Sequence, residues 1–390
     1  MKNLIYLLLL SMTIPSCKKE EARQVNQYTI EQFYTNTRFE GGTFSADETR
    51  LLVGSDETGI FNLYEITLAD GAKKQLTTST VESYYPVDYV PGMSALIYSA
   101  DKGGNEIDHL YLLEDNGKTT DLTPGENNKV SFFKWSEDKK SMFYISNIRD
   151  PKYFDVYKMN IGEWIPTLFY ENKSGLDVNE ISDDEKTLVV SKTVTTSENE
   201  LYLVNKETGT QTELSLPDQK GRYGVSGISK DSKYVFYLTD GGKEFTYLVQ
   251  YDMNSGERKV LYETTWDVMY TFLSEKETYR VIAINEDGKN TIIMQDAASG
   301  KTIDFPAIPD GDILGVEISD SEKLMRLSVG TSKAPNNIYL YNLETKELKK
   351  LTESLNKEIN ADDLVSAEVV RYKSFDGLDI PAIYYKPHQA

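Results

Sequence analysis

One pattern of apolar and polar positions repeats along most of the chain. Each copy has an apolar residue, a polar turn that begins with serine, usually as Ser-x-Asp, and then a β-rich apolar run. Six copies are clear, namely FSADETRLLVGS at Phe44, WSEDKKSMFYIS at Trp135, ISDDEKTLVVSK at Ile181, ISKDSKYVFYLT at Ile228, LSEKETYRVIAI at Leu273 and ISDSEKLMRLSV at Ile318. Their serines are separated by steps of 91, 46, 47, 45 and 45 residues. A degenerate copy, VPGMSALIYSA at Val90, fills the doubled first step, so the pattern predicts seven units of about 45 residues.

Each unit contains four segments of the strand type. The polar turn, whose side chains can bond nearby backbone amides, leads into a run such as YVFYLT. A variable loop, an alternating strand such as ELYLVN, a second turn and a short outer strand ending in QLT or DLT follow. Because a single four-stranded blade exposes two apolar faces, stacking seven blades in a ring buries both. The sequence therefore predicts an all-β, seven-bladed β-propeller over residues 28–365, with one short helix over Thr29–Tyr34.

The N-terminus has the layout of a secretory signal. Lys2 precedes the apolar run Leu4–Leu10, which is too short to span a bilayer. The stretch TIPSC resembles a bacterial lipobox and ends in Cys17, the only cysteine of the chain. We therefore expect a lipoprotein signal peptide at 1–16, lipid attachment at Cys17, a tether at 17–27 and a periplasmic or outer-membrane-associated location in a bacterial envelope. An ordinary signal peptide cut nearby, or an uncleaved anchor, is the alternative.

Charge narrows the choice of partners. The chain has 42 Lys and Arg against 62 Asp and Glu, a formal net charge of -20. Such a surface repels nucleic acid and anionic lipid, so we expect no nucleic-acid partner and membrane contact only through the N-terminal lipid. A lone cysteine also excludes an intramolecular disulfide, and the fold must rest on its apolar core.

The propeller sequence offers no recognisable catalytic apparatus. His109 opens an inner-type strand, where a structural role is expected, and His388 lies two residues from the end. No G-x-S-x-G nucleophile elbow occurs; GVSGIS at Gly224 has the wrong spacing and lies in a predicted blade turn. Two distant histidines and one cysteine cannot build a zinc site, and the acidic stretch 285–290 is better read as an Asp-Gly hairpin. We predict no catalytic residue, metal site or cofactor.

The C-terminal stretch differs from the repeats. RYKSFDGLDIPAIYYKP resembles the segment that leads into the catalytic domain of S9 (prolyl oligopeptidase family) serine peptidases, through Ser374, Asp376, Gly377 and Pro387. YTIEQFY near the mature N-terminus is similar to the lead-in of the same peptidases. The resemblance implies that 366–390 begin an α/β-hydrolase domain with a hairpin, that the chain is truncated there, and that the Ser-Asp-His triad would follow Ala390. We expect this chain alone to be inactive.

In that family the propeller limits access to short peptides, which implies peptide substrates when the catalytic domain is present. The longest charged and aromatic loop between the second and third strands is RDPKYFD, so Arg149 and Asp150 are candidates for a substrate-facing loop. A solvated loop, or a salt bridge to a neighbouring blade, is the alternative for both residues. The alternative for the whole chain is a stand-alone envelope propeller similar to the TolB type, acting as a binding scaffold. A propeller enzyme with its site in the central channel would need clustered catalytic side chains, which the sequence lacks.

Overall fold

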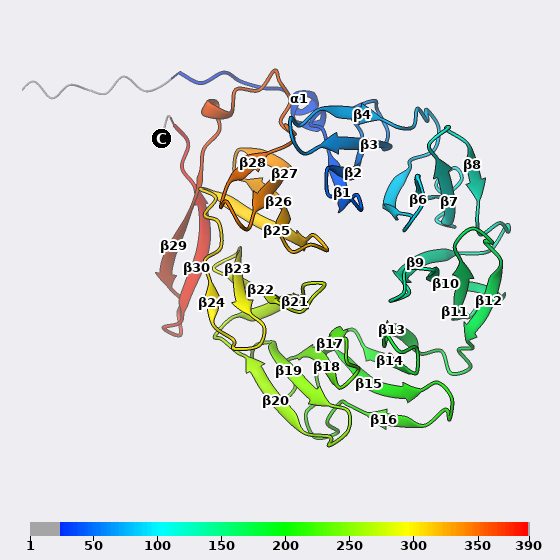
Figure 1. The fold of residues 1–390 in the computed structure, drawn as a ribbon. Helices are drawn as coiled ribbons and strands as arrows, with labels where there is room; N and C mark the ends of the chain where they lie inside the picture. The colour runs from blue at the N-terminus through cyan, green and yellow to red at the C-terminus, as the bar shows by residue number, and fades with distance from the viewer. Residues whose placement is uncertain (1–23, 389–390) are drawn as a thin grey trace, which may run out of the picture.

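The computed structural model describes residues 24–388, and in this part of the chain seven four-stranded antiparallel sheets form a closed ring (Figure 1). Each sheet is one blade made of four consecutive strands, and the first strand of each lies nearest the centre. A short helix precedes blade 1, and a two-stranded hairpin follows blade 7. The repeat pattern therefore predicted the number of blades correctly.

The strands of blades 1 to 3 are β1 (Phe39–Phe44), β2 (Arg50–Ser55), β3 (Asn62–Thr67), β4 (Lys73–Gln75), β5 (Tyr85–Tyr89), β6 (Ala95–Ala100), β7 (His109–Glu114), β8 (Thr119–Asp121), β9 (Val130–Trp135), β10 (Ser141–Asp150), β11 (Tyr153–Asn160) and β12 (Pro166–Tyr170). Those of blades 4 and 5 are β13 (Asp177–Ile181), β14 (Thr187–Thr195), β15 (Glu198–Asn205), β16 (Gln211–Glu213), β17 (Tyr223–Ile228), β18 (Tyr234–Thr239), β19 (Tyr247–Asp252) and β20 (Arg258–Tyr262). Blades 6 and 7 contain β21 (Asp267–Leu273), β22 (Tyr279–Glu286), β23 (Lys289–Asp296), β24 (Thr302–Ile303), β25 (Gly311–Ile318), β26 (Leu324–Thr331), β27 (Ala334–Asn342) and β28 (Leu348–Lys350).

The polar turns are built as their composition predicts. In blade 4, the Ser182 hydroxyl donates to Asp184 at 2.6 Å and accepts the backbone N–H of Thr187 at 2.9 Å. The fourth residue of this turn, Glu185, has a left-handed φ of 60°. The same arrangement of hydroxyl and carboxylate recurs in blades 1, 3 and 5. Each turn thus satisfies its own backbone and joins the first strand to the second.

Apolar clusters fill the seams between neighbouring blades. Leu51 and Val53 on β2 face the seam with blade 7, whereas Leu52 between them faces the seam with blade 2. All three side chains are fully buried, because both faces of the strand are covered. This two-sided burial explains the continuous apolar runs of the second strands, and it makes each blade depend on both of its neighbours.

Antiparallel pairing gives the ring two different faces. We call the face that carries the turns between first and second strands the turn face, and these turns are residues 45–49, 90–94, 136–140, 182–186, 229–233, 274–278 and 319–323. We call the opposite face, which carries the loops between second and third strands, the loop face, and these loops are residues 56–61, 101–108, 151–152, 196–197, 240–246, 287–288 and 332–333. The variable loops of the repeat therefore share one face, as expected from the sequence.

The ring closes without a shared strand. Blade 7 meets blade 1 through an apolar cluster that includes Ile338 and Tyr64. On the turn face, Glu48 of blade 1 accepts the N–H of Ser321 of blade 7 at 2.7 Å. Lys349 of β28 also donates to the carbonyl of Leu68 at 3.0 Å. Packing and polar contacts between complete blades hold this seam, as they hold the others.

The segments before and after the propeller lie against each other. Helix α1 (Ile30–Tyr34) begins with a capping box between Thr29 and Gln32, which confirms the predicted helix. The Tyr28 hydroxyl donates to Asp363 at 2.7 Å, next to a 3-10 turn at Ala361–Asp363. The strands of the C-terminal hairpin are β29 (Ala367–Lys373) and β30 (Asp379–Tyr385).

The structure places GVSGIS differently from the sequence prediction, and it does not describe the N-terminal segment. GVSGIS lies on the innermost strand β17 and in the turn that follows it, so its assignment to a blade turn alone was wrong. The predicted signal peptide, Cys17 and most of the tether lie outside the described residues. In residues 24–388, no helix is both long and apolar enough to cross a membrane.

Candidate functional site

The C-terminal hairpin lies at the outer edge of the ring, beside blades 6 and 7 (Figure 1), and contacts two loops of the loop face. The Arg371 guanidinium donates from Nη2 to both carboxylate oxygens of Asp287, at 2.5 and 2.7 Å, in the β22–β23 turn. The Ala367 N–H donates to the Ser332 hydroxyl in the β26–β27 loop at 3.0 Å. The chain therefore leaves the propeller on the face that carries the variable loops.

The hairpin exposes a group of large apolar side chains. Phe375 is fully exposed at its tip, and seven further large apolar side chains on it are exposed. These are Val369, Val370, Tyr372, Leu378, Ile383, Tyr384 and Tyr385. A two-stranded hairpin is marginally stable in water, and an exposed apolar group of this kind is typical of an interaction surface.

The residues of the C-terminal motif lie at the tip and at the end of the hairpin. Ser374, Asp376 and Gly377 form the turn between β29 and β30, with Gly377 at a φ of 88° that favours glycine. The Leu378 N–H and the Ser374 side chain hydrogen-bond to Asp376 and lower the pKa of its carboxyl group. Pro387 follows the end of β30.

The predicted substrate-facing residues lie at the tip of the β10–β11 hairpin, on the loop face. Arg149 donates from Nε and Nη2 to the buried carboxylate of Asp155, at 2.6 and 2.9 Å, and from Nη2 to the Asn172 carbonyl at 3.0 Å. The bond to Asp155 raises the pKa of Arg149 above its ordinary value. Asp150, at the end of β10, accepts the Lys152 N–H at 2.9 Å and is partly buried. Arg149 thus fixes the hairpin through Asp155 and Asn172, whereas the side-chain hydrogen bond of Asp150 stays within the hairpin tip.

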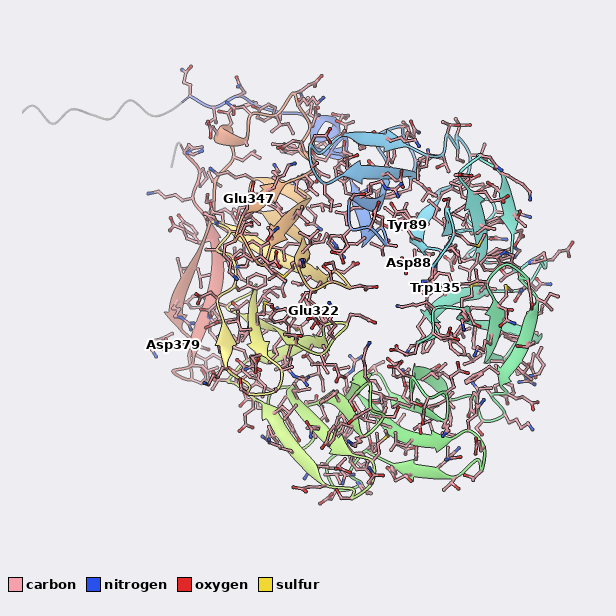
Figure 2. All side chains as sticks on the ribbon, in the orientation of Figure 1. Asp88, Tyr89, Trp135, Glu322, Glu347 and Asp379 are labelled. Atoms are coloured by element: carbon pink, nitrogen blue, oxygen red, sulfur yellow. The ribbon has the colours of Figure 1, made fainter. Side chains whose placement is uncertain are left out.

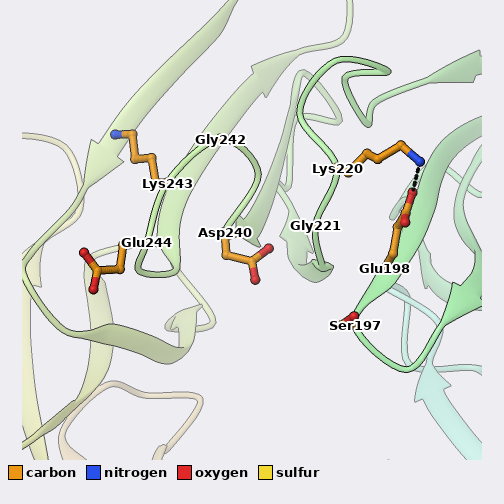
Figure 3. Close-up of a pocket in the computed structure, with 8 residues that line it drawn as sticks. All are labelled: Ser197, Glu198, Lys220, Gly221, Asp240, Gly242, Lys243 and Glu244. Atoms are coloured by element: carbon orange, nitrogen blue, oxygen red, sulfur yellow. Dashed lines mark ion pairs between the residues drawn. The ribbon is translucent and has the colours of Figure 1, made fainter.

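A groove of about 550 Å³ opens on the loop face between blades 4 and 5 (Figure 3). Lys220 and Glu198 form an ion pair of 3.3 Å on one wall. On the floor, Asp240 accepts the Arg222 N–H at 2.7 Å. A side chain on Gly221 would meet the Gly241 nitrogen at 2.9 Å, so glycine is required for this approach. The groove is open and charged, and it suits an extended polar chain better than an apolar ligand.

The central channel holds a buried carboxylate near the turn face (Figure 2). Asp88 on β5 accepts the indole N–H of Trp135 from the neighbouring blade at 2.9 Å and the N–H of Tyr89 at 2.8 Å. Burial raises the pKa of Asp88 to about 6, against the lowering effect of these two hydrogen bonds. A cavity of about 290 Å³ adjoins this pair, with Glu317 of blade 7 also on its wall. Asp88 and Trp135 therefore link two blades inside the channel.

His109 has a structural environment. It is buried on β7, its Nδ1 lies 2.8 Å from Asp121 Oδ2, and its Nε2 lies 2.9 Å from the Gly125 carbonyl oxygen. His388 Nε2 lies 3.3 Å from the Leu364 carbonyl oxygen. Within residues 24–388, no group of three or more histidine, cysteine or acidic side chains could hold a metal ion.

The comparisons with known proteins agree with this architecture. Residues 87–354, more than half of the chain, match the family model for the prolyl oligopeptidase N-terminal beta-propeller domain. The chain belongs to this family. A dipeptidyl aminopeptidase BIII from Pseudoxanthomonas mexicana is 23% identical over 304 residues, which are 75% of this chain and 43% of the relative.

Solved structures show the same fold at low identity. A prolyl endopeptidase is 17% identical with a TM-score of 0.69, over 90% of this chain and 54% of the other. Prolyl oligopeptidase B from Galerina marginata gives 16% and 0.66, over 90% and 55%. A puromycin-hydrolysing peptidase from Mycobacterium tuberculosis gives 12% and 0.69, over 91% and 59%. The chain spans about half the length of the relatives it matches.

Sequence reasoning missed two contacts of the site. The Asp88–Trp135 hydrogen bond joins residues one repeat apart, so an alignment of the repeats offers a signal for it. The Arg371–Asp287 pair joins the C-terminal motif to a turn 84 residues earlier, and no sequence pattern predicts this contact.

Proposed function

We propose that this propeller covers and gates a serine-hydrolase domain, which packs on its loop face and cleaves peptides. The observation that carries this proposal is the attachment of the hairpin to the loop face by Arg371 and Asp287. The next part of the polypeptide would begin there, over the variable loops, and would cover the apolar side chains of the hairpin. Membership of the prolyl oligopeptidase propeller family supports the same reading.

In this account the loop face is the substrate side. Asp150 at the β10–β11 tip and the charged groove between blades 4 and 5 would meet peptides before they reach the hydrolase domain. Arg149 would act only by holding the hairpin through Asp155. We further propose that the protein is exported and anchored through Cys17, on the strength of its N-terminal sequence.

The test uses the protein as its source cells make it. An antibody against the propeller isolates the polypeptide after treatment of the cells with a fluorescent fluorophosphonate, which labels active-site serines of hydrolases. We expect the label on a polypeptide heavier than the 390-residue chain, and its loss when an unlabelled fluorophosphonate is added first. An isolated polypeptide without label would contradict the proposal and favour a stand-alone envelope scaffold.

A further inference from the structure

The second residue of each polar turn lies at the turn-face end of the channel. In chain order these residues are Ala46, Pro91, Glu137, Asp183, Lys230, Glu275 and Asp320. Four of these seven positions are acidic and one is basic. At these seven turn positions the mouth of the channel thus carries an acidic ring of four carboxylates and one lysine, Lys230.

That lysine reaches across the mouth. Lys230 Nζ of blade 5 lies 3.1 Å from Glu275 Oε1 of blade 6 and 3.3 Å from Glu137 Oε1 of blade 3. Blades 3 and 5 are not neighbours, because blade 4 stands between them. The three side chains line one cavity of about 350 Å³, together with Ser226 on the innermost strand β17. Lys230 therefore bridges part of the opening rather than one seam.

Hydrogen bonds hold the backbone at Lys230, whereas the ion pairs of its side chain are exposed and can be broken. The Lys230 N–H donates to Glu277 of blade 6 at 2.8 Å, and the Ser229 hydroxyl donates to Asp231 at 2.8 Å. The side chains of Lys230, Glu137 and Glu275 are 38%, 47% and 35% exposed. Ion pairs with this exposure stabilise weakly and are screened by salt.

A second lysine on the same cavity provides a contrast. Lys134 Nζ lies within 3.3 Å of Glu180, of Asp183 and of the Ile181 carbonyl oxygen, all in the adjacent blade 4. Its three acceptors are on one neighbouring blade, and it stays on the channel wall. Lys134 is a seam contact, and Lys230 is the one of the two that crosses the opening.

We propose that Lys230 is a latch across the part of the turn-face mouth between blades 3 and 6, and that it yields to cationic groups. An incoming ammonium group, such as a peptide N-terminus or a lysine side chain, can replace the Lys230 ammonium between Glu137 and Glu275. Neither carboxylate is left unpaired in this exchange. An anionic or neutral molecule offers no such replacement, so the mouth selects cationic chain ends. This inference goes beyond the proposed function and holds for the propeller alone.

The test measures access to a thiol placed under the latch. Cys17→Ser removes the natural cysteine, and Ser226→Cys places a thiol of nearly the same size in the cavity. The rates of its reaction with cationic, anionic and neutral methanethiosulfonates are compared with and without Lys230→Gln. The control is Lys233→Gln, which removes an equal charge from the same turn, where Lys233 pairs with Asp231 at 2.8 Å. Thermal unfolding of every variant establishes that the propeller is folded.

We expect Lys230→Gln to raise the rate with the neutral reagent at least about threefold, and the rate with the cationic reagent more, because the acidic ring remains. With Lys230 present, raising the salt concentration should speed the neutral reagent, and the cationic reagent should react faster than the anionic one. The control should leave all three rates unchanged. Equal rates for Lys230→Gln and Lys233→Gln with the neutral reagent would overturn the latch. Faster reaction of the anionic than of the cationic reagent would overturn the selectivity.

Discussion

Arg371 on the C-terminal hairpin and Asp287 in the β22–β23 turn form an ion pair, in which Arg371 Nη2 lies 2.5 and 2.7 Å from the two carboxylate oxygens of Asp287. The pair fixes the direction in which the polypeptide leaves the propeller. It places the hairpin beside blades 6 and 7, on the face where all the second-to-third strand loops lie. The account of function rests on this placement, since it decides which face a following domain would cover.

Breaking this pair should loosen the hairpin and leave the blades intact. Both side chains are partly exposed, so the pair should stabilise the docked hairpin by up to about 1 kcal/mol. We expect Arg371→Gln to raise amide hydrogen exchange across residues 367–385 by about two- to fivefold, with no change in blade 6. Lys373→Gln, which removes an ion pair within the hairpin, is the control. Equal exchange in the two variants would show that Asp287 does not hold the hairpin.

The turn serines should contribute measurably to stability. Ser182→Ala removes, at a buried position, the acceptor of the Thr187 N–H and the donor to Asp184. Such a loss should lower the free energy of unfolding by about 1–2 kcal/mol. The exposed Ser197, at the β14–β15 tip, provides the control, and Ser197→Ala should change stability by less than about 0.5 kcal/mol. Urea unfolding followed by circular dichroism measures both, and similar midpoints would contradict the role given to the turn.

Asp88 should make the free energy of unfolding depend on pH, with a sign that can be measured. Its pKa is raised from 3.8 to about 6 in the folded protein, so between these values the folded chain binds more protons than the unfolded chain. The free energy of unfolding therefore falls as pH rises through this window, by about 2–3 kcal/mol from this group. Asp88→Asn should remove that fall.

Asp47, a carboxylate in the polar turn of blade 1, gives the control for this pH dependence. Hydrogen bonds from Ser45 and Thr49 lower the pKa of Asp47 to about 2. Its stabilising effect is therefore present above pH 4 and is lost as pH falls towards 2. Asp47→Asn should keep the wild-type slope between pH 4 and 6. Chemical unfolding at closely spaced pH values decides the matter, and an unchanged slope in Asp88→Asn would refute the assignment.

Lipid attachment at Cys17 is also open to direct measurement. In a bacterial host, the wild-type protein should incorporate labelled palmitate and partition into the detergent phase of Triton X-114. Cys17→Ser should lose both properties, because the thiol is the attachment point implied by the TIPSC sequence. A wild-type protein that carries no label and remains in the aqueous phase would contradict the lipoprotein signal.

Local chemistry made most of the fold predictable. The serine of each turn, the alternating strands and the doubled step at Val90 predicted seven blades, because a blade is built from neighbouring residues. Thr29 and Gln32, which are three positions apart, form the capping box at the start of the predicted helix. Ring closure was not predictable, because every blade is complete and the last seam depends on how six other seams add up.

The candidate site was less predictable for the same physical reason. Asp88 and Trp135 are 47 residues apart, and Lys230 and Glu137 are 93 apart. These contacts exist only because the ring turns the first strands of different blades towards one channel. Arg149 was singled out by the length and charge of its loop, but its partner Asp155 is buried six residues on, and burial is decided by blade packing. Charge in a loop singled out this hairpin, and Asp150 remains the residue proposed to face substrate.

The measurement that tests the central claim most directly is the sequence of the gene and its transcript through and beyond codon 390, in all three frames. The account predicts a segment with a G-x-S-x-G elbow, followed by an aspartate and then a histidine in the order of an α/β-hydrolase. A hydrolase domain found there would place its first strands at the Arg371–Asp287 attachment on the loop face. Downstream sequence that encodes nothing of this kind would contradict the account, and the function of the propeller would then have to be sought in binding.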